Sequence, residues 1–150
     1  MKKLLSISLL TLLMVACQSN RQGQFAKESD ESLTNVRVEI SHAGGPAIKF
    51  DTIYFDLGSL AIDAPNQTRD FIFANTGDAS LVIEKVEASC SCLDVDYPKD
   101  SIASGKKSKI TMTLKMNEVS SGQFYRSANV YTNASDEPTE IILQGIKCYE

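Results

Sequence analysis

The stretch ITMTLKM, residues 110–116, alternates apolar and polar side chains along its whole length. A period of two residues is that of an extended strand with one buried face and one face in water. The stretch therefore predicts a half-buried β-strand. Residues 128–133 show a similar alternation, with Ala128, Val130 and Thr132 on one face and Asn129, Tyr131 and Asn133 on the other.

Further β-rich runs occupy most of the chain on both sides of this strand. They are residues 36–41, 47–55, 69–74, 81–88, 93–97 and 139–147. Turn-forming sequences separate several of them, at residues 43–46 (AGGP), 75–78 (NTGD), 103–106 (ASGK) and 135–138 (SDEP). No segment of this region holds a helical period. Seven or eight short strands joined by regular turns predict an all-β, immunoglobulin-like antiparallel β-sandwich over residues 36–150.

The composition limits the classes of function. The chain has 150 residues and a net charge of −4, which suits one domain with a tail and makes non-specific binding to nucleic acid an unexpected role. His42 is the single histidine, so a histidine-rich metal site is excluded. No G-x-S-x-G motif accompanies it. We therefore expect a protein that is not an enzyme, with no catalytic residues and no cofactor.

The N-terminal sequence is typical of a targeting segment. Lys2 and Lys3 precede an uncharged, mostly apolar run at residues 4–16, which is shorter than the about 20 residues of a transmembrane helix. We expect residues 1–16 to be a signal peptide. Met14-Val15-Ala16-Cys17 resembles the lipobox of bacterial lipoproteins, which implies cleavage before Cys17 and lipidation of that residue. An ordinary secreted protein with a chance cysteine at the cleavage point is the alternative.

The segment that follows Cys17 is polar. Residues 17–35 are predicted to form the lipidated N-terminus and a flexible linker. Gln18 stands where an Asp would favour retention in the inner membrane, so the expected location is the outer membrane of the cell envelope. Removing residues 1–16 takes away Lys2 and Lys3, and the mature net charge becomes 13 − 19 = −6.

A series of short motifs follows one order along the chain. They are residues 48–51 (IKFD), 55–58 (FDLG), 71–78 (FIFANTGD), 81–83 (LVI), 89–92 (SCSC), 104–106 (SGK) and 131–133 (YTN). This order resembles the Ig-like domain of unknown function found in bacterial secreted proteins and lipoproteins, whose architecture is akin to Hydin-type and major-sperm-protein-like domains. The resemblance covers about residues 47–147. The resemblance implies a fold and a location in the cell envelope, and it implies no biochemical activity. The family often has Gly where Ser91 stands between the two cysteines.

Cys90, Cys92 and Cys148 are the remaining cysteines, in a compartment that permits disulfides. In a continuous strand the Cα atoms of Cys90 and Cys92 would lie about 6.6 Å apart, so pairing requires a bend. If the strand continues without a break, the two thiols share the solvent face with Asp94 and Asp96, and neighbouring negative charge disfavours a thiolate. If residues 81–88 and 139–147 flank one central strand, Cys90 and Cys148 reach the same end of the sheet. Buried structural thiols, a disulfide with one free thiol, and a copper or zinc site all remain open.

Two classes of function remain. The first is a lipid-anchored cell-envelope protein whose Ig-like domain is a non-enzymatic binding or structural module for a protein or glycan. The second is a lipoprotein that handles thiol redox chemistry or a soft metal through Cys90, Cys92 and Cys148. The first class needs no active site. Sandwiches of this kind commonly bind other molecules, and this support comes from fold analogy alone.

Overall fold

A computed structural model describes residues 38–41 and 44–149 of the protein. The predicted signal peptide at residues 1–16, the linker at residues 17–35, Cys17 and His42 lie outside these described residues. Within the described ranges, no helix combines the length and apolar character that crossing a bilayer would require.

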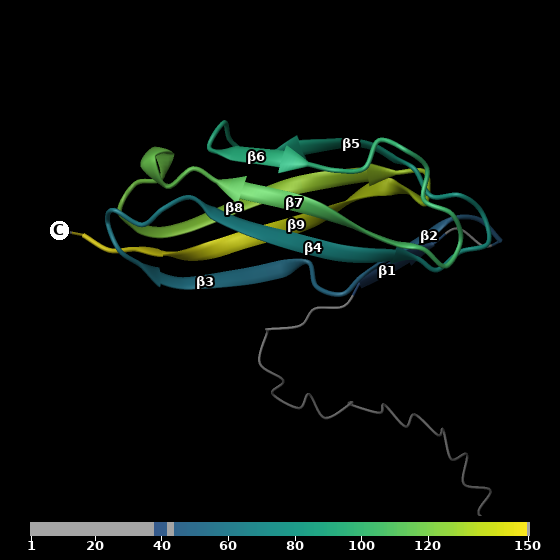
Figure 1. The fold of residues 1–150 in the computed structure, drawn as a ribbon, viewed down its shortest axis with the longest axis horizontal. Coiled ribbons are helices and arrows are strands. Elements are labelled where there is room, and N and C mark those ends of the chain that lie inside the picture. Colours follow the sequence, from purple (N-terminus) through teal and green to yellow (C-terminus); the bar gives the residue numbers. More distant parts are fainter. Residues whose placement is uncertain (1–37, 42–43, 150) are drawn as a thin grey trace, which may run out of the picture. The chain divides into compact units, whose positions relative to one another are not determined.

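The described residues form nine strands and one short 3-10 helix, arranged in two sheets (Figure 1). The first sheet has the order β1-β2-β4-β7-β6, made of Val38–Ser41, Ala47–Phe50, Gln67–Asn75, Lys107–Leu114 and Leu93–Asp96. The second has the order β3-β9-β8-β5, made of Tyr54–Leu60, Ser135–Lys147, Gly122–Thr132 and Ile83–Ala88. The helix η1 spans Met116–Glu118. The predicted all-β sandwich is confirmed, with more strands than expected.

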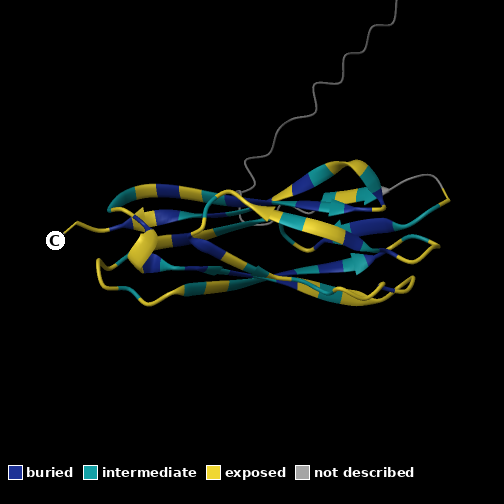
Figure 2. Ribbon diagram, turned by 90° about the horizontal axis from the view of Figure 1, so that it is seen from above, coloured by how far each residue is buried: buried dark blue, intermediate teal, exposed yellow. Residues whose placement is uncertain are grey.

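The core lies between the two sheets and follows the alternation of the strands (Figure 2). Ile110, Met112 and Leu114 of β7 have no exposed surface, whereas Thr111 and Thr113 between them are half-buried. Phe71 and Phe73 of β4 lie beside them, and Ile141 and Leu143 of β9 are buried on the inner face of the second sheet. Alternation in residues 110–114 therefore identified the buried face of the central strand, as expected of a half-buried strand.

The sequence predicted one β-rich run at residues 47–55, but the structure has two separate strands there. The chain leaves the first sheet after Phe50 and enters the second at Tyr54, so β2 and β3 belong to different sheets. Asp51 N still bonds to Ile72 O of β4, while Ile53 O already accepts Ile142 N of β9. Strand β3 pairs in parallel with β9, which is the exception among otherwise antiparallel pairs. A run of apolar residues carries no mark of such a switch.

Two predicted boundaries also moved. Residues 135–138 were expected to be a turn but begin β9, and the actual turn between β8 and β9 is at Asn133 and Ala134. A 13-residue strand places Pro138 inside β9, where its side chain is half-buried. Met116 was expected to end a strand, but it starts η1 and is buried.

Candidate functional site: the Cys90–Cys92 turn

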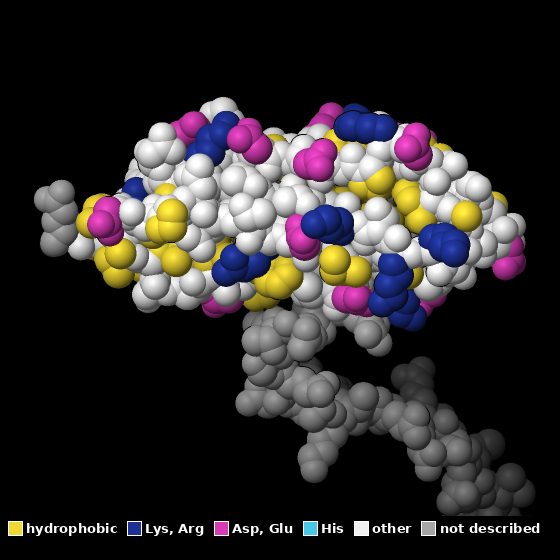
Figure 3. Space-filling view, viewed as in Figure 1, with side chains coloured by type: hydrophobic (Ala, Val, Ile, Leu, Met, Phe, Trp, Pro, Cys, Tyr) yellow, Lys and Arg dark blue, Asp and Glu magenta, His cyan; other side chains and the backbone are white. Residues whose placement is uncertain are grey.

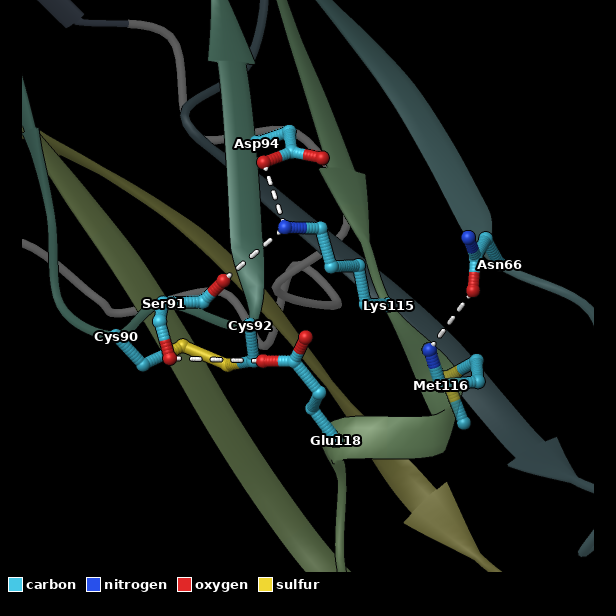
Figure 4. A network of polar contacts seen from close by, with 8 residues as sticks. All are labelled: Asn66, Cys90, Ser91, Cys92, Asp94, Lys115, Met116 and Glu118. Carbon is cyan, nitrogen blue, oxygen red and sulfur yellow. Dashed lines mark hydrogen bonds and ion pairs between the residues drawn. A yellow bond between two sulfur atoms is a disulfide. The ribbon is translucent and has the colours of Figure 1, made fainter.

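Cys90 and Cys92 lie in the turn that carries the chain from β5 in the second sheet to β6 in the first. The backbone of the turn is fastened at three points. Ser89 N bonds to Ser127 O of β8 at 2.9 Å, Leu93 N bonds to Cys90 O at 3.3 Å, and Lys115 N bonds to Cys92 O at 2.9 Å. Both sheets therefore hold the turn in position. Figure 4 shows the turn with the polar contacts around it.

The two cysteines form a disulfide within this turn. Their Cα atoms lie 5.1 Å apart, less than the about 6.6 Å of an extended strand. The bend that pairing requires is thus present, and it forms with Ser91 at the centre of the turn. Cys90 is half-buried, while the side chain of Cys92 is 4% exposed. The two cysteines therefore differ in their exposure to solvent.

Arg126 places a positive charge against one of the two sulfurs. It lies on β8 opposite Leu143, on the side of the strand that also carries Phe124 and Ala128. Its Nε donates to Cys92 Sγ at 3.2 Å, and its Nη1 donates to Tyr125 O at 2.7 Å. No hydrogen bond from Arg126 to Cys90 is present among the described residues. The buried sulfur alone is thus paired with the guanidinium.

The outer rim of the turn is charged. Lys115 Nζ lies 2.8 Å from Asp94 Oδ1 and donates to Ser91 O at 3.3 Å, while Ser91 Oγ and Glu118 Oε2 lie 3.5 Å apart. The hydrogen bond to Asp94 raises the pKa of Lys115 above its usual value. These contacts hold Ser91, the central residue of the turn, against Lys115 and Glu118.

The expectation that the thiols share a solvent face with Asp94 and Asp96 is wrong. It assumed a continuous strand, but the turn interrupts it and β6 begins only at Leu93. The break sends Cys92 inward to Arg126, while Asp94 points outward to Lys115. The charge beside the buried sulfur is therefore positive, which reverses the predicted electrostatic effect on a thiolate.

Cys148 is exposed and free, and the structure does not bring it to the other two cysteines. Strands β5 and β9 do flank β8 and run in the same direction, as predicted. However, Ser89 lies opposite Ser127, whereas Lys147 lies opposite Gly122. Five residues of β8 separate these levels, which is roughly 17 Å. Among the residues with described side chains, no three Cys, His, Asp or Glu groups gather as a metal site would require.

A second feature is a hollow on the outer face of the second sheet, over β3, β9 and β8. Its volume is about 390 Å³. Its lining consists of Asp56, Gly58, Ser59, Gln123, Phe124, Tyr125, Gln144, Gly145 and Ile146. Tyr125 and Ile146 are large side chains that are 50% and 41% exposed. A Cβ on Gly145 would come within 2.9 Å of both Gly58 O and the Phe124 ring, so a side chain there would displace its neighbours.

Arg126 and Tyr125 were missed by the sequence analysis. The signal for Arg126 was available, because the alternation Phe124, Arg126, Ala128, Val130 places a basic residue on an otherwise apolar strand face. An unpaired charge is rare on such a face, so its presence predicts a specific partner. No comparable signal marked Tyr125, since an aromatic residue on the polar face of a strand is common.

Solved structures match the chain at low sequence identity. A protein of unknown function from Porphyromonas gingivalis W83 matches with a TM-score of 0.60 and 14% identity over 71% of this chain and 49% of that one. The secreted serine protease VesC from Vibrio cholerae matches with a TM-score of 0.49 and 13% identity, over 69% and 23% of the two chains. WR4, a C. elegans MSP family member, has a TM-score of 0.43 and 14% identity, over 67% and 97%. The first likeness supports the fold alone, and the chain spans about half of that relative.

Comparison by sequence defines the family. No curated protein matches the chain. The family model of DUF1573, described as a protein of unknown function, matches residues 48–146, which include β3 to β8, the Cys90–Cys92 turn and most of β9. This match spans more than half of the 150 residues, and the chain therefore belongs to the DUF1573 family.

Proposed function

We propose that the protein is a lipid-anchored cell-envelope protein of the outer membrane, and that its Ig-like domain is a non-enzymatic binding module. The anchor is supported by the sequence of residues 2–17, in which a basic start, an apolar run, Ala16 and Cys17 follow the order of a lipoprotein signal. Several acyl chains on Cys17 would hold the protein firmly, because stable anchoring needs more than one chain.

The hollow over β3, β9 and β8 is the observation that carries the binding role. Tyr125 and Ile146 offer apolar surface there, and Asp56, Gln123 and Gln144 offer polar groups beside it. Binding sites commonly combine apolar contact area with a few polar groups that fix orientation. A segment of a protein or a glycan fits this mixture. Basic and acidic side chains are interspersed on the face seen in Figure 3.

A photo-crosslinking amino acid tests this role in intact cells. Placed at position 125, it should give a discrete product of higher mass, because Tyr125 is half exposed in the hollow. Position 131 is the matched control, since Tyr131 lies on the same face of β8 but sits against Lys85, 4.1 Å from its ring centroid. Equal crosslinking at both positions, or at neither, would contradict a binding site in the hollow.

Substitution of Cys17 tests the anchor. The Cys17→Ser chain cannot be acylated at that residue, so it should leave the membrane pellet and appear in the soluble fraction. Cys148→Ser is the control, because Cys148 is exposed at the far end of β9 and should not affect fractionation. A Cys17→Ser chain that still pellets with membranes would show that the anchor is wrongly assigned.

Thiol-based redox chemistry is a second candidate function, and one observation favours it. The Cys90–Cys92 disulfide has a guanidinium 3.2 Å from Cys92 Sγ, and a nearby cation favours a thiolate in the reduced state. The metal-binding form of this candidate has no such support, because Cys148 lies apart from the other two cysteines.

A further inference from the structure

We infer that the Cys90–Cys92 disulfide accepts electrons from a dithiol, that Cys90 is the sulfur attacked, and that Arg126 stabilises Cys92 as the leaving thiolate. This inference rests on the redox candidate above and adds the direction of the reaction, the role of each residue and the class of substrate. It is independent of the hollow on the second sheet.

The unequal burial of the two cysteines favours attack on the more exposed one. Cys90 is half-buried and precedes the exposed Ser91, whereas Cys92 is 4% exposed and packs into the core. An attacking thiolate must approach the sulfur along the S–S axis from the side opposite the bond. The exposure of Cys90 permits this approach, and the burial of Cys92 hinders it there.

The charge distribution favours the same direction. When the disulfide opens, a negative charge develops on the sulfur that leaves. Arg126 Nε already lies 3.2 Å from Cys92 Sγ, so the donor is in place before the charge forms. Hydrogen bonds to a charged group are stronger than those to a neutral one, and a lower thiol pKa makes a better leaving group.

The electrons and protons balance as follows. A thiolate of the partner attacks Cys90 Sγ and forms a mixed disulfide, while the Cys90–Cys92 bond breaks and its electron pair stays on Cys92 Sγ. The partner's second thiolate attacks the partner's first sulfur, which is bonded to Cys90 in the mixed disulfide. This attack releases Cys90 as a thiolate. The partner is oxidised to a disulfide by loss of two electrons. The two protons released by its thiols balance those that the reduced Cys90 and Cys92 take up.

The small ring lets the disulfide open without disturbing the two sheets that hold the turn. Only Ser91 separates the two cysteines, so the bond closes a short loop and adds little to the order of the chain. The turn backbone is fixed by its own hydrogen bonds to β8 and to Lys115. Reduction therefore leaves the scaffold around the sulfurs in place.

The first experiment uses the full chain with Cys17→Ser and Cys148→Ser, which leaves two of the four cysteines. The protein is equilibrated in mixtures of reduced and oxidised glutathione, and free thiols are counted by mass after alkylation. The disulfide should pass to two thiols within the range of these mixtures. A disulfide that persists in reduced glutathione alone would overturn the redox candidate itself.

The second experiment tests the direction of attack. Reduction by glutathione is stopped early with acid, and the glutathione adduct is located by peptide mass. At least a tenfold excess of adduct on Cys90 over Cys92 is expected. Equal amounts, or an excess on Cys92, would overturn the assignment of Cys90 while leaving the redox candidate standing.

The third experiment tests Arg126 through the pH dependence of alkylation of Cys92 in a Cys90→Ser chain. Arg126→Met should slow alkylation at neutral pH roughly tenfold or more, as expected for loss of a hydrogen bond to a charged group, and move the profile to higher pH. Lys115→Met is the control, because Lys115 contacts the turn but neither sulfur, and its effect should stay under about twofold.

Arg126→Lys keeps the charge on a side chain of similar length and should give an intermediate rate. This variant provides the comparison should Arg126→Met fail to fold. Unchanged alkylation in both Arg126 variants, or an equal effect of Lys115→Met, would show that Arg126 does not stabilise the thiolate.

Discussion

At the scale of single residues, Asn75 shows how one side chain of a turn motif connects several loops. Its side chain is fully buried and uses both ends of the amide. Oδ1 accepts Gly77 N at 3.0 Å and Ala47 N at 3.4 Å, while Nδ2 donates to Ala79 O and Ile102 O, each at 2.8 Å. The motif NTGD therefore connects three separate loops, at the end of β7 that lies away from the disulfide.

Replacement of this amide should destabilise the fold strongly. Asn75→Ala leaves buried backbone groups of three loops without partners, and we expect a loss of about 2–4 kcal/mol in the free energy of unfolding. Urea denaturation followed by far-UV circular dichroism measures it. Asn129→Ala is the control, because Asn129 is half-buried on the outer face of β8 and should change stability by less than about 0.5 kcal/mol.

The loops that Asn75 connects also require a glycine at position 77. A Cβ at this position would lie 2.2 Å from Gly45 O and 2.4 Å from Ala47 N, which are backbone atoms that cannot rotate away. The glycine of NTGD is therefore explained by the close approach of another loop. Sequence reasoning read it only as a turn former.

At the scale of elements, β4 and β7 form the centre of the first sheet. Asp70 lies opposite Thr111 across the pair. Lys109 Nζ donates to Asp70 Oδ2 and Thr111 Oγ1 donates to Oδ1, each at 2.7 Å. These hydrogen bonds, that of Lys109 first, hold the pKa of Asp70 below its usual value. The carboxylate therefore binds the two strands more strongly when it is ionised.

This pair predicts a pH dependence of stability. A depressed pKa contributes stability above about pH 4, where the unfolded carboxyl is ionised, and the contribution is lost as the pH falls through the lower folded value. Asp70→Asn should thus be less stable than the wild type at pH 7, by at most about 1 kcal/mol for so exposed a pair, and the difference should vanish near pH 2. Urea titrations at several pH values measure it. A difference that grows in acid would contradict the assignment.

The turn between β5 and β6 gives a second prediction at this scale. A disulfide that closes so short a loop restricts the unfolded chain little, so the Cys90→Ser/Cys92→Ser double variant should lose less than about 2 kcal/mol. Thermal denaturation with and without reductant measures it. A loss of 4 kcal/mol or more would show that the disulfide is chiefly a structural bond.

At the scale of the whole sandwich, the two sheets depend on each other for their buried faces. Phe71 of β4 and Phe55 of β3 pack edge to face across the interface, with ring centroids 5.0 Å apart. Phe50 and Phe73 extend this aromatic layer within the first sheet, at 5.5 Å. Because β3 follows β2 directly but lies in the other sheet, the chain itself also joins the two layers.

Unfolding should therefore be cooperative across both sheets. Phe71→Ala removes a fully buried ring and should cost about 3–5 kcal/mol. Hydrogen exchange should show amides of β4 and of β9 losing protection together as the variant is destabilised. Loss confined to the first sheet would contradict a single cooperative unit.

Much of the fold was predictable because burial on one face imposes a period of two residues. The alternation in β7 and β8 and the turn motifs at Asn75 and Gly105 identified strands and their buried faces without any structure. The switch of sheet at Asp51 was not predictable, since an extended backbone has the same pattern in either sheet. The start of β9 was missed because the polar residues 135–138 have turn-like composition.

The sequence by itself determined the class of fold, the family and the spacing of the cysteines, because these depend on local pattern and on residue identity. Only the tertiary structure decided the environment of the sulfurs. The break at Cys90–Cys92 buries one sulfur beside Arg126, which is 34 residues further along the chain. The stagger of β5 and β9 along β8 keeps Cys148 away from both. Register between distant strands sets these contacts, and register is a property of the assembled sheets.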